Sequence, residues 1–224
     1  MEIEEKDELF RRRQTYREEI SNAIQAAIFS GELKPKDKIV ETYWANRLGV
    51  SQGPVREAIR DLEGMGLVET VPFKGSRVHS LTKKDIRDAY SVRICLESKS
   101  IKDAIVELSE EEMKTLTAEM ESILDEMEGY ADAGNLQQFT DADARFHSAI
   151  IRSTGNEVLL KLWKQCNIRN WFMVSDLTDR NSLLQLHNDH RHIAEGITER
   201  SVEKAVSTLE EHLTSLMMNH IDHM

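Results

Sequence analysis

The sequence has few residues that break helices and no long apolar run. Its 224 residues include only 10 glycines and 3 prolines, whereas 31% of them are charged. This composition favours a mainly α-helical fold over a turn-rich all-β fold. No segment approaches the roughly 18 consecutive apolar residues of a transmembrane helix, and the acidic start MEIEEKDELFRRR lacks the layout of a signal peptide. We therefore expect a cytoplasmic protein without a membrane partner.

Cysteine and the common catalytic motifs are scarce as well. Cys95 and Cys166 lie far apart and outside any CxxC pattern, which argues against a zinc ribbon or a disulfide framework and suits a reducing cytosol. We expect both thiols to be buried as small apolar side chains. The HExxH, GxGxxG and Walker patterns are missing, and no glutamate stands three residues before a histidine. The signatures of zinc proteases, di-iron carboxylate enzymes and nucleotide-binding enzymes are therefore absent.

Negative charge is unevenly distributed along the chain, whose formal net charge is −11. Residues 81–224 hold 16 Lys and Arg against 26 Asp and Glu, a net charge of −10. Residues 11–80 hold 12 against 9, a net charge of +3. Because neutralisation of phosphates is the main source of DNA affinity, DNA binding is compatible with the N-terminal part only.

Three helices are predicted in the first 65 residues. Apolar residues recur with helical spacing over 15–29, and a second helix fits ETYWANRLG at 41–49. A third begins at Ser51, a good N-cap, with Pro54 in the first turn, where its missing N–H does no harm.

A β-hairpin is predicted next, because strand-like residues flank PFKGS and place Gly75 at the tip. Three helices and such a hairpin make a winged helix-turn-helix. Thr82, with Asp85 three residues later, then opens a new helix. We predict a winged helix-turn-helix DNA-binding domain at 1–81, whose first ten residues form a tail, and an effector-binding and dimerisation domain at 82–224.

The predicted third helix carries the polar side chains of a DNA-reading helix. Such a helix presents them from its N-terminal half, where arginine can pair bidentately with guanine edges. Arg56 and Arg60 lie four residues apart on one face, and the hairpin adds basic residues beside a glycine. An ordinary solvated helix, with Arg56 paired to Glu57 or Asp61, is the alternative. The candidate DNA contacts are Ser51, Gln52, Arg56, Arg60, Lys74, Gly75 and Arg77.

The remainder of the chain predicts an all-α antiparallel bundle. Capping residues and glycines delimit helices at 83–107, 109–132, 135–154, 156–175, 180–199 and 201–220. Asp143 and His147 share a face beside the apolar stripe of one helix, and His190 and His212 lie on the apolar stripes of two others. A lone histidine of this kind is usually a satisfied core residue, but four convergent donors form the ligand set of a divalent transition metal. The histidines expected on the surface are His187, His192, His220 and His223.

The run LGVSQGPVREAIRDLEGMGLVETVPFKGSRV resembles the GntR family of bacterial transcription regulators, whose usual pattern is LGVSRTPVREAL, then GLV and a basic wing with glycine. The resemblance implies DNA contact by Arg56 and Arg60, a helix start at Ser51 and a wing glycine at Gly75. Gln52 and the following Gly replace the Arg-Thr of the family pattern. Because glutamine can read adenine bidentately, we expect an altered operator preference and no loss of binding.

Residues 85–215 resemble the FCD domain, the effector domain of the FadR-like branch of that family, in its six-helix VanR-like form. The resemblance implies that Asp143, His147, His190 and His212 bind a divalent transition metal such as Zn, Ni or Mn. It also implies two open positions in an octahedral site, which a small carboxylate effector completes. Two arginines are candidate effector contacts: Arg93 near the family's pocket, for which a salt bridge with Glu97 is the alternative, and Arg145 next to the ligands.

The predicted function is a ligand-responsive transcription regulator, such as a repressor, that binds a palindromic DNA operator as a homodimer. Two alternatives remain at this point. One is a metal-dependent enzyme built in the bundle, which needs an activating base beside the metal. The other is a structural metal without an effector role. The missing catalytic motifs favour the regulator, so we predict that the protein is not an enzyme.

Overall fold

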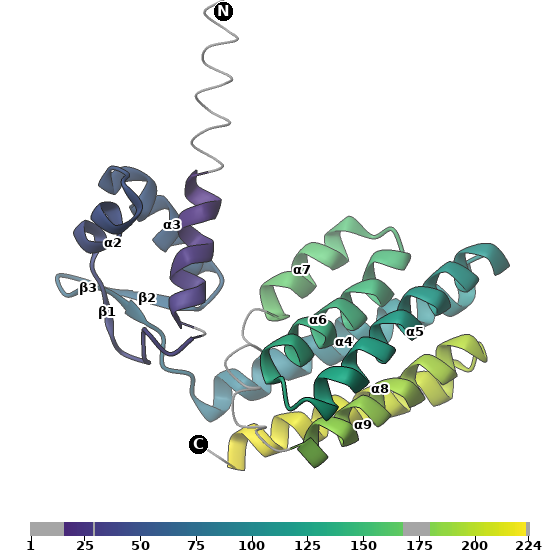
Figure 1. Cartoon of the computed structure of the whole chain (residues 1–224). Coiled ribbons are helices and arrows are strands. Elements are labelled where there is room, and N and C mark those ends of the chain that lie inside the picture. The colour runs from purple at the N-terminus through teal and green to yellow at the C-terminus, as the bar shows by residue number, and fades with distance from the viewer. Residues whose placement is uncertain (1–15, 29, 168–179, 223–224) are drawn as a thin grey trace, which may run out of the picture. The chain divides into compact units, whose positions relative to one another are not determined.

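The computed structural model describes residues 16–28, 30–167 and 180–222 (Figure 1). The chain divides into two compact units between Leu81 and Thr82. Among the described residues, no helix combines the length and the apolar character that crossing a lipid bilayer requires. The fold is mainly helical, as predicted, and strands occur only in the described part of the first unit.

The first unit is a winged helix-turn-helix. The helix at 16–28, α2 (Glu41–Leu48) and α3 (Gln52–Gly64) each bury apolar side chains, among them Ile24, Trp44 and Leu62. Gly49 ends α2 in the left-handed conformation, which glycine adopts without steric cost. The strands of this unit are β1 (Lys38–Ile39), β2 (Val68–Val71) and β3 (Gly75–Val78).

The wing differs from the prediction in two respects. The sheet has three antiparallel strands in the order β1-β3-β2, because Lys38 and Ile39 pair with Arg77 and Ser76. A two-residue strand has too little alternation to be found by sequence pattern. Gly75 is also not the tip of the hairpin: it pairs with Val71 as the first residue of β3, and the turn consists of residues 72–74.

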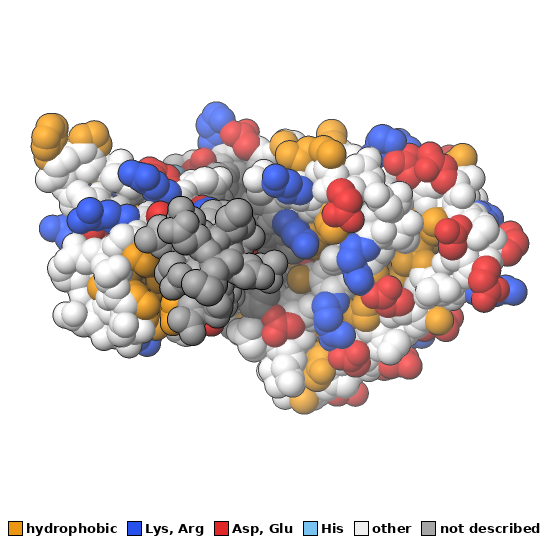
Figure 2. All heavy atoms as spheres, turned by 90° about the horizontal axis from the view of Figure 1, so that it is seen from above, with side chains coloured by type: hydrophobic (Ala, Val, Ile, Leu, Met, Phe, Trp, Pro, Cys, Tyr) orange, Lys and Arg blue, Asp and Glu red, His pale blue; other side chains and the backbone are white. Residues whose placement is uncertain are grey.

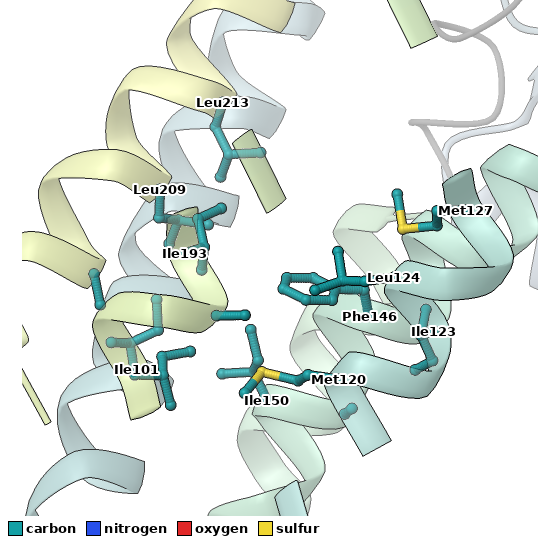
Figure 3. Packing of buried hydrophobic residues seen from close by; sticks show 14 of the residues in the cluster. Ile101, Met120, Ile123, Leu124, Met127, Phe146, Ile150, Ile193, Leu209 and Leu213 are labelled. Carbon is teal, nitrogen blue, oxygen red and sulfur yellow. The ribbon is translucent and has the colours of Figure 1, made fainter. Parts of the chain in front are cut away.

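The second unit is a helical bundle, as predicted. Its core receives side chains from five helices, among them Ile101, Met120, Phe146, Ile193 and Leu209 (Figure 3). Capping boxes start α4 at Thr82 and α5 at Ser109. The helices are α4 (Lys83–Glu107), α5 (Glu110–Asp132), α6 (Leu136–Ser153), α7 (Glu157–Asn167), α8 (Arg180–Thr198) and α9 (Val202–Asp222). The predicted extension of α7 to residue 175 lies outside the described residues.

The prediction that both cysteines are buried is wrong for Cys95, which is exposed, and Cys166 is half-buried. On α4, Cys95 lies two residues from the buried Arg93 and Glu97, and a step of two residues turns a helix by about 200°. Arg93 and Glu97 occupy the inward face, so Cys95 points outward.

Candidate metal centre and nucleic-acid interface

Four side chains from three helices converge at the edge of the bundle core. Asp143 and His147 come from α6, His190 from α8 and His212 from α9. One ligand atom from each of the four lies within 4.8 Å of the others. The three histidines are 2% exposed or less and Asp143 is 9% exposed. The ring of Phe146 lies 4.9 Å from that of His190, so the cluster borders the apolar core directly.

Each histidine of the cluster has its Nδ1 atom beside an acceptor. His190 Nδ1 is hydrogen-bonded to the Leu186 carbonyl at 2.7 Å, and His212 Nδ1 to Asp189 Oδ2 at 3.3 Å. His147 Nδ1 lies 2.6 Å from Glu97 Oε2, a close contact outside hydrogen-bond geometry. An acceptor at Nδ1 favours the tautomer with the proton on Nδ1, so that Nε2 keeps its lone pair. This is the arrangement of histidines that bind a metal through Nε2.

The Nε2 atoms face electron-rich neighbours. His190 Nε2 lies 3.1 Å from His147 Nε2 and 3.0 Å from Asp143 Oδ1, and His212 Nε2 is buried with no hydrogen-bond partner among the described residues. Lone pairs at these distances repel one another unless a proton or a cation lies between them. Three imidazole nitrogens and one carboxylate form a donor set that suits a divalent transition metal. The residues present therefore fit such an ion.

Burial and neighbouring charge set the protonation of the cluster. Burial, followed by the effect of His190, lowers the pKa of His212 to about 4, and burial also lowers the pKa of His147. Both imidazoles are therefore neutral at pH 7, the form that binds metals. Burial raises the pKa of Asp143, but its contact with His190 and the charge of nearby Arg93 outweigh burial and hold that pKa well below its usual range. The carboxylate is thus ionised and able to bind a cation.

Arg93 lies beside the cluster. Its guanidinium forms an ion pair but has hydrogen-bond donors without an acceptor among the described residues. It is 1% exposed, and its Nε donates to Glu97 Oε1. Burial opposes its charge, but Glu97 and Asp143 outweigh burial and raise the pKa of Arg93. Its two terminal nitrogens are buried without a hydrogen-bond partner among the described residues. The salt bridge with Glu97, which was the alternative to an effector contact, therefore exists, and it still leaves two N–H groups for a carboxylate.

Glu97 is a site residue that the sequence did not reveal. Its Oε1 atom accepts hydrogen bonds from Arg93 Nε and, at 2.7 Å, from Trp163 Nε1. Its Oε2 atom faces His147. Burial opposes ionisation, but Arg93 and His147 outweigh it and lower the pKa of Glu97 to about 2. Only its spacing of four residues from Arg93 hinted at a role.

Arg145 lies away from the cluster, and two predictions on the exposure of histidines in this unit are wrong. Arg145 lies on the outer face of α6, where its guanidinium binds Glu126 at 2.7 Å and the side chain is 47% exposed. Arg145 is two positions from each of Asp143 and His147 along α6, and this spacing turns it away from the cluster.

The exposure of the histidines differs in part from the prediction. Acidic and basic side chains are interspersed over the face shown in Figure 2, and no histidine is visible on it. His187 and His220 are buried rather than exposed. His192 is exposed, and His223 lies outside the described residues.

The predicted DNA contacts occupy an exposed face of α3 and the wing. Ser51, Gln52, Arg56 and Arg60 are exposed at the start and along the outer face of α3. Ser51 is at the N-cap position, but its side chain makes no capping hydrogen bond. In the wing, Lys74 and Gly75 are exposed and Arg77 is half-buried.

Arg56 has a partner other than those considered from the sequence. Its Nε donates to Glu41 Oε2 at 2.6 Å, and Asp61 pairs instead with Arg17. Arg77 similarly donates to Glu69 Oε1 at 2.7 Å. Exposed pairs of this kind contribute about 0–1 kcal/mol, so both arginines can exchange them for a DNA partner at small expense.

Comparisons with known proteins agree with this architecture. The protein-family model described as "FCD domain" matches residues 88–215 of this chain. The family model described as "Bacterial regulatory proteins, gntR family" matches residues 16–78. The chain is 29% identical over 205 residues to the "Uncharacterized HTH-type transcriptional regulator YdhC" of Bacillus subtilis, covering 91% of this chain and 88% of that one. It is 24% identical over 193 residues to the "HTH-type transcriptional repressor GlaR" of Escherichia coli, covering 83% and 87%. The fold is similar to that of E. coli McbR/YncC, with a TM-score of 0.78, 18% identity and coverage of 93% and 98%.

Proposed function

Given that the chain belongs to the GntR family of bacterial transcription regulators and carries an FCD domain, we propose that a divalent metal and a small carboxylate in the helical unit control DNA binding by the winged helix. The protein is a transcription regulator with a DNA-binding domain and is not an enzyme.

The observation that carries the proposal is the convergence of ionised Asp143 with the Nε2 lone pairs of His147, His190 and His212. These four residues would hold the ion through one carboxylate oxygen and three imidazole nitrogens. The bound ion supplies a Lewis-acidic centre that attracts a further oxygen ligand. Zinc, nickel and manganese are the candidates, because imidazole and carboxylate donors suit all three.

A small carboxylate is the proposed effector because the cluster adjoins an arginine with unused donors. Arg93 is buried and charged, and its two terminal nitrogens have no hydrogen-bond partner among the described residues. A carboxylate that contacts the metal and accepts from these nitrogens satisfies both groups at once. This explains why a charged side chain is kept beside the metal ligands.

Control of DNA binding follows if the effector prefers one arrangement of a homodimer. Two winged helices then meet the half-sites of a palindromic operator only in arrangements with matching spacing. An effector with a few kcal/mol of preference for one arrangement changes operator affinity. In this proposal α3 reads the major groove through Gln52, Arg56 and Arg60. The wing contacts the adjacent part of the operator through Lys74, Gly75 and Arg77.

Metal binding is tested with two histidines of the same helix. The metal-free protein and its His190→Ala and His192→Ala variants are titrated with Zn, Ni and Mn in competition with a fluorescent chelator. Loss of a hydrogen-bond partner of a metal ligand weakens metal affinity about 10- to 100-fold. His190→Ala removes the ligand itself and should weaken metal affinity by more than this. His192→Ala, which alters an exposed side chain, should leave affinity unchanged. Equal affinity in all three proteins contradicts the assigned ligands.

Effector binding is tested with two arginines. Small mono-, di- and tricarboxylates are screened by calorimetry against the metal-loaded protein, and the tightest ligand is titrated into Arg93→Met and Arg145→Met. Because hydrogen bonds to charged groups contribute about 1.5–3 kcal/mol, Arg93→Met should weaken binding at least about 10-fold. Arg145→Met should leave binding unchanged. A carboxylate that binds Arg93→Met normally contradicts the role of Arg93, and one that binds but leaves operator affinity unchanged contradicts the regulatory role.

A further inference from the structure

An aromatic side chain stands fully in solvent at the tip of the wing. Val71 at the end of β2 pairs with Gly75 at the start of β3, so residues 72–74 form a three-residue turn. Phe73 is the middle residue of this turn and has a relative exposure of 108%. Its φ angle is +62°, in the left-handed region that non-glycine residues rarely adopt. The turn thus projects an apolar ring away from the core of its own unit.

Phe73 is unfavourable for the isolated protein on two counts. Glycine or asparagine adopts a positive φ angle in a turn more easily than a bulky aromatic residue. The ring also remains in water, so it contributes no hydrophobic stabilisation to the fold. Neither burial nor backbone preference therefore accounts for a phenylalanine at this position. Strain and exposure together at one residue point to a partner that covers the ring.

The surroundings of Phe73 identify the chemistry of that partner. The next residue, Lys74, is exposed, and Arg77 on β3 forms a partly exposed ion pair with Glu69. The same unit presents the exposed arginines Arg56 and Arg60 on α3. An apolar ring beside cations, on a unit with a DNA-reading helix, suits the minor groove of DNA, where apolar wedges insert between base pairs and cations contact the phosphates.

We propose that Phe73 is a specificity-determining wedge, which enters the minor groove beside the major-groove half-site read by α3 and partly unstacks one base step. The inference rests on operator binding by α3 and adds a contact outside the sequence that α3 reads. Wedge insertion is easiest at pyrimidine–purine steps such as TA and CA, which unstack readily. The operator therefore prefers such a step at the position of the wing, and the bound duplex is kinked there.

The test uses the full-length protein and a duplex that it selects from a random pool. Kd is measured by fluorescence anisotropy for the parent protein and for Phe73→Ala, Phe73→Leu and Tyr43→Ala, the last altering another exposed aromatic residue of the same unit. Phe73→Ala should raise Kd about 10-fold, equivalent to about 1.4 kcal/mol. Phe73→Leu should retain most of the affinity because leucine also acts as a wedge, and Tyr43→Ala should bind as the parent does.

A second measurement reports the wedge itself. A 2-aminopurine base placed across the flank of the selected duplex gains fluorescence when it is unstacked. The parent protein and Phe73→Leu should raise this fluorescence at one step, whereas Phe73→Ala should not. Melting temperature should be unchanged in Phe73→Ala, because the ring makes no buried contact.

The two measurements separate failure of the wedge from failure of the proposed operator contacts. If Phe73→Ala binds with the parent Kd and the same 2-aminopurine signal, the wedge is refuted, while weaker binding by Arg60→Ala still supports reading by α3. If Phe73→Ala loses affinity and the parent gives no unstacking at any flank position, the ring contacts something other than a base step and the proposal is overturned. If neither Arg60→Ala nor Phe73→Ala changes Kd, the DNA contacts of the proposed function fail as well.

Discussion

Replacing Glu97 with glutamine should weaken metal binding although Glu97 is not one of the four proposed ligands. Its Oε2 atom lies 2.6 Å from His147 Nδ1, and its Oε1 atom accepts from Arg93 Nε and Trp163 Nε1. Glutamine has nearly the same shape, but only one of its two terminal atoms accepts hydrogen bonds. If the amide oxygen stays with Arg93 and Trp163, the amide N–H₂ faces His147. The imidazole then favours the tautomer with its proton on Nε2, where the metal must bind.

The expected size of the effect follows from the number of ligands disturbed. Glu97→Gln disturbs one of the four ligands, the imidazole of His147, and removes no ligand atom. Loss of the partner group beside a metal-binding imidazole weakens metal affinity about 10- to 100-fold, or about 1.4–2.8 kcal/mol. Removal of the ligand itself, as in His147→Ala, should cost more. The order of affinities is therefore parent, then Glu97→Gln, then His147→Ala.

The assay is competition between the protein and a fluorescent zinc chelator at fixed pH. Trp163→Phe is the matched control, because it removes another donor from the same carboxylate and leaves the contact between Glu97 and His147 in place. It should bind zinc like the parent. Circular dichroism and thermal unfolding of each metal-free protein check that it folds, since Glu97→Gln leaves the buried charge of Arg93 without its anionic partner.

Unchanged zinc affinity in folded Glu97→Gln refutes the reasoning, because His147 then keeps its tautomer without the carboxylate. Equal losses in Glu97→Gln and Trp163→Phe also contradict it and indicate a general loosening of the bundle. If Glu97→Gln does not fold, Asp189→Asn examines the same principle at His212. Asp189 Oδ2 lies 3.3 Å from His212 Nδ1, and the Asp189 side chain is 33% exposed. Asp189→Asn should weaken zinc binding by the lower end of the same range, and an unchanged affinity would again refute the principle.

Three further predictions concern stability and DNA binding. Gly196→Ala should lower the free energy of unfolding, measured by urea unfolding, by about 1–3 kcal/mol, because a Cβ atom on Gly196 meets Ala205 N at 2.7 Å. Gly129→Ala should be neutral or stabilising, because a Cβ atom there meets no described atom within 4 Å outside its own helix backbone and chain neighbours. Zinc at about 100 times its Kd should raise that free energy by about 2.7 kcal/mol in the parent and far less in His212→Ala, and thermal unfolding with and without a chelator checks this. Arg56→Ala should weaken binding to a selected operator by about 1–3 kcal/mol in anisotropy titrations, and normal binding would exclude Arg56 as a base contact.

The parts of the fold that depend on neighbours in sequence could be predicted. Helix positions follow from apolar spacing and capping residues, so α4 starts at Lys83, as predicted from Thr82 and Asp85. The same spacing places Asp143 and His147 on the buried side of α6. The strand β1 escaped prediction because two residues carry no period, and it exists only because β3 lies beside it. The tip of the wing was assigned to Gly75 because glycine is a turn signal, yet the turn consists of residues 72–74 and Phe73 in it adopts a positive φ angle.

The sequence by itself therefore determined the helical elements and the candidate ligands, because periodicity and residue chemistry are local properties. The tertiary structure alone decided which of these residues meet. Glu97 and His147 are 50 positions apart in sequence, and no pattern along the chain indicates their contact. Packing also decided that His187 and His220 are buried. Burial and contact depend on what other helices place against a face, and that placement results from folding of the whole bundle.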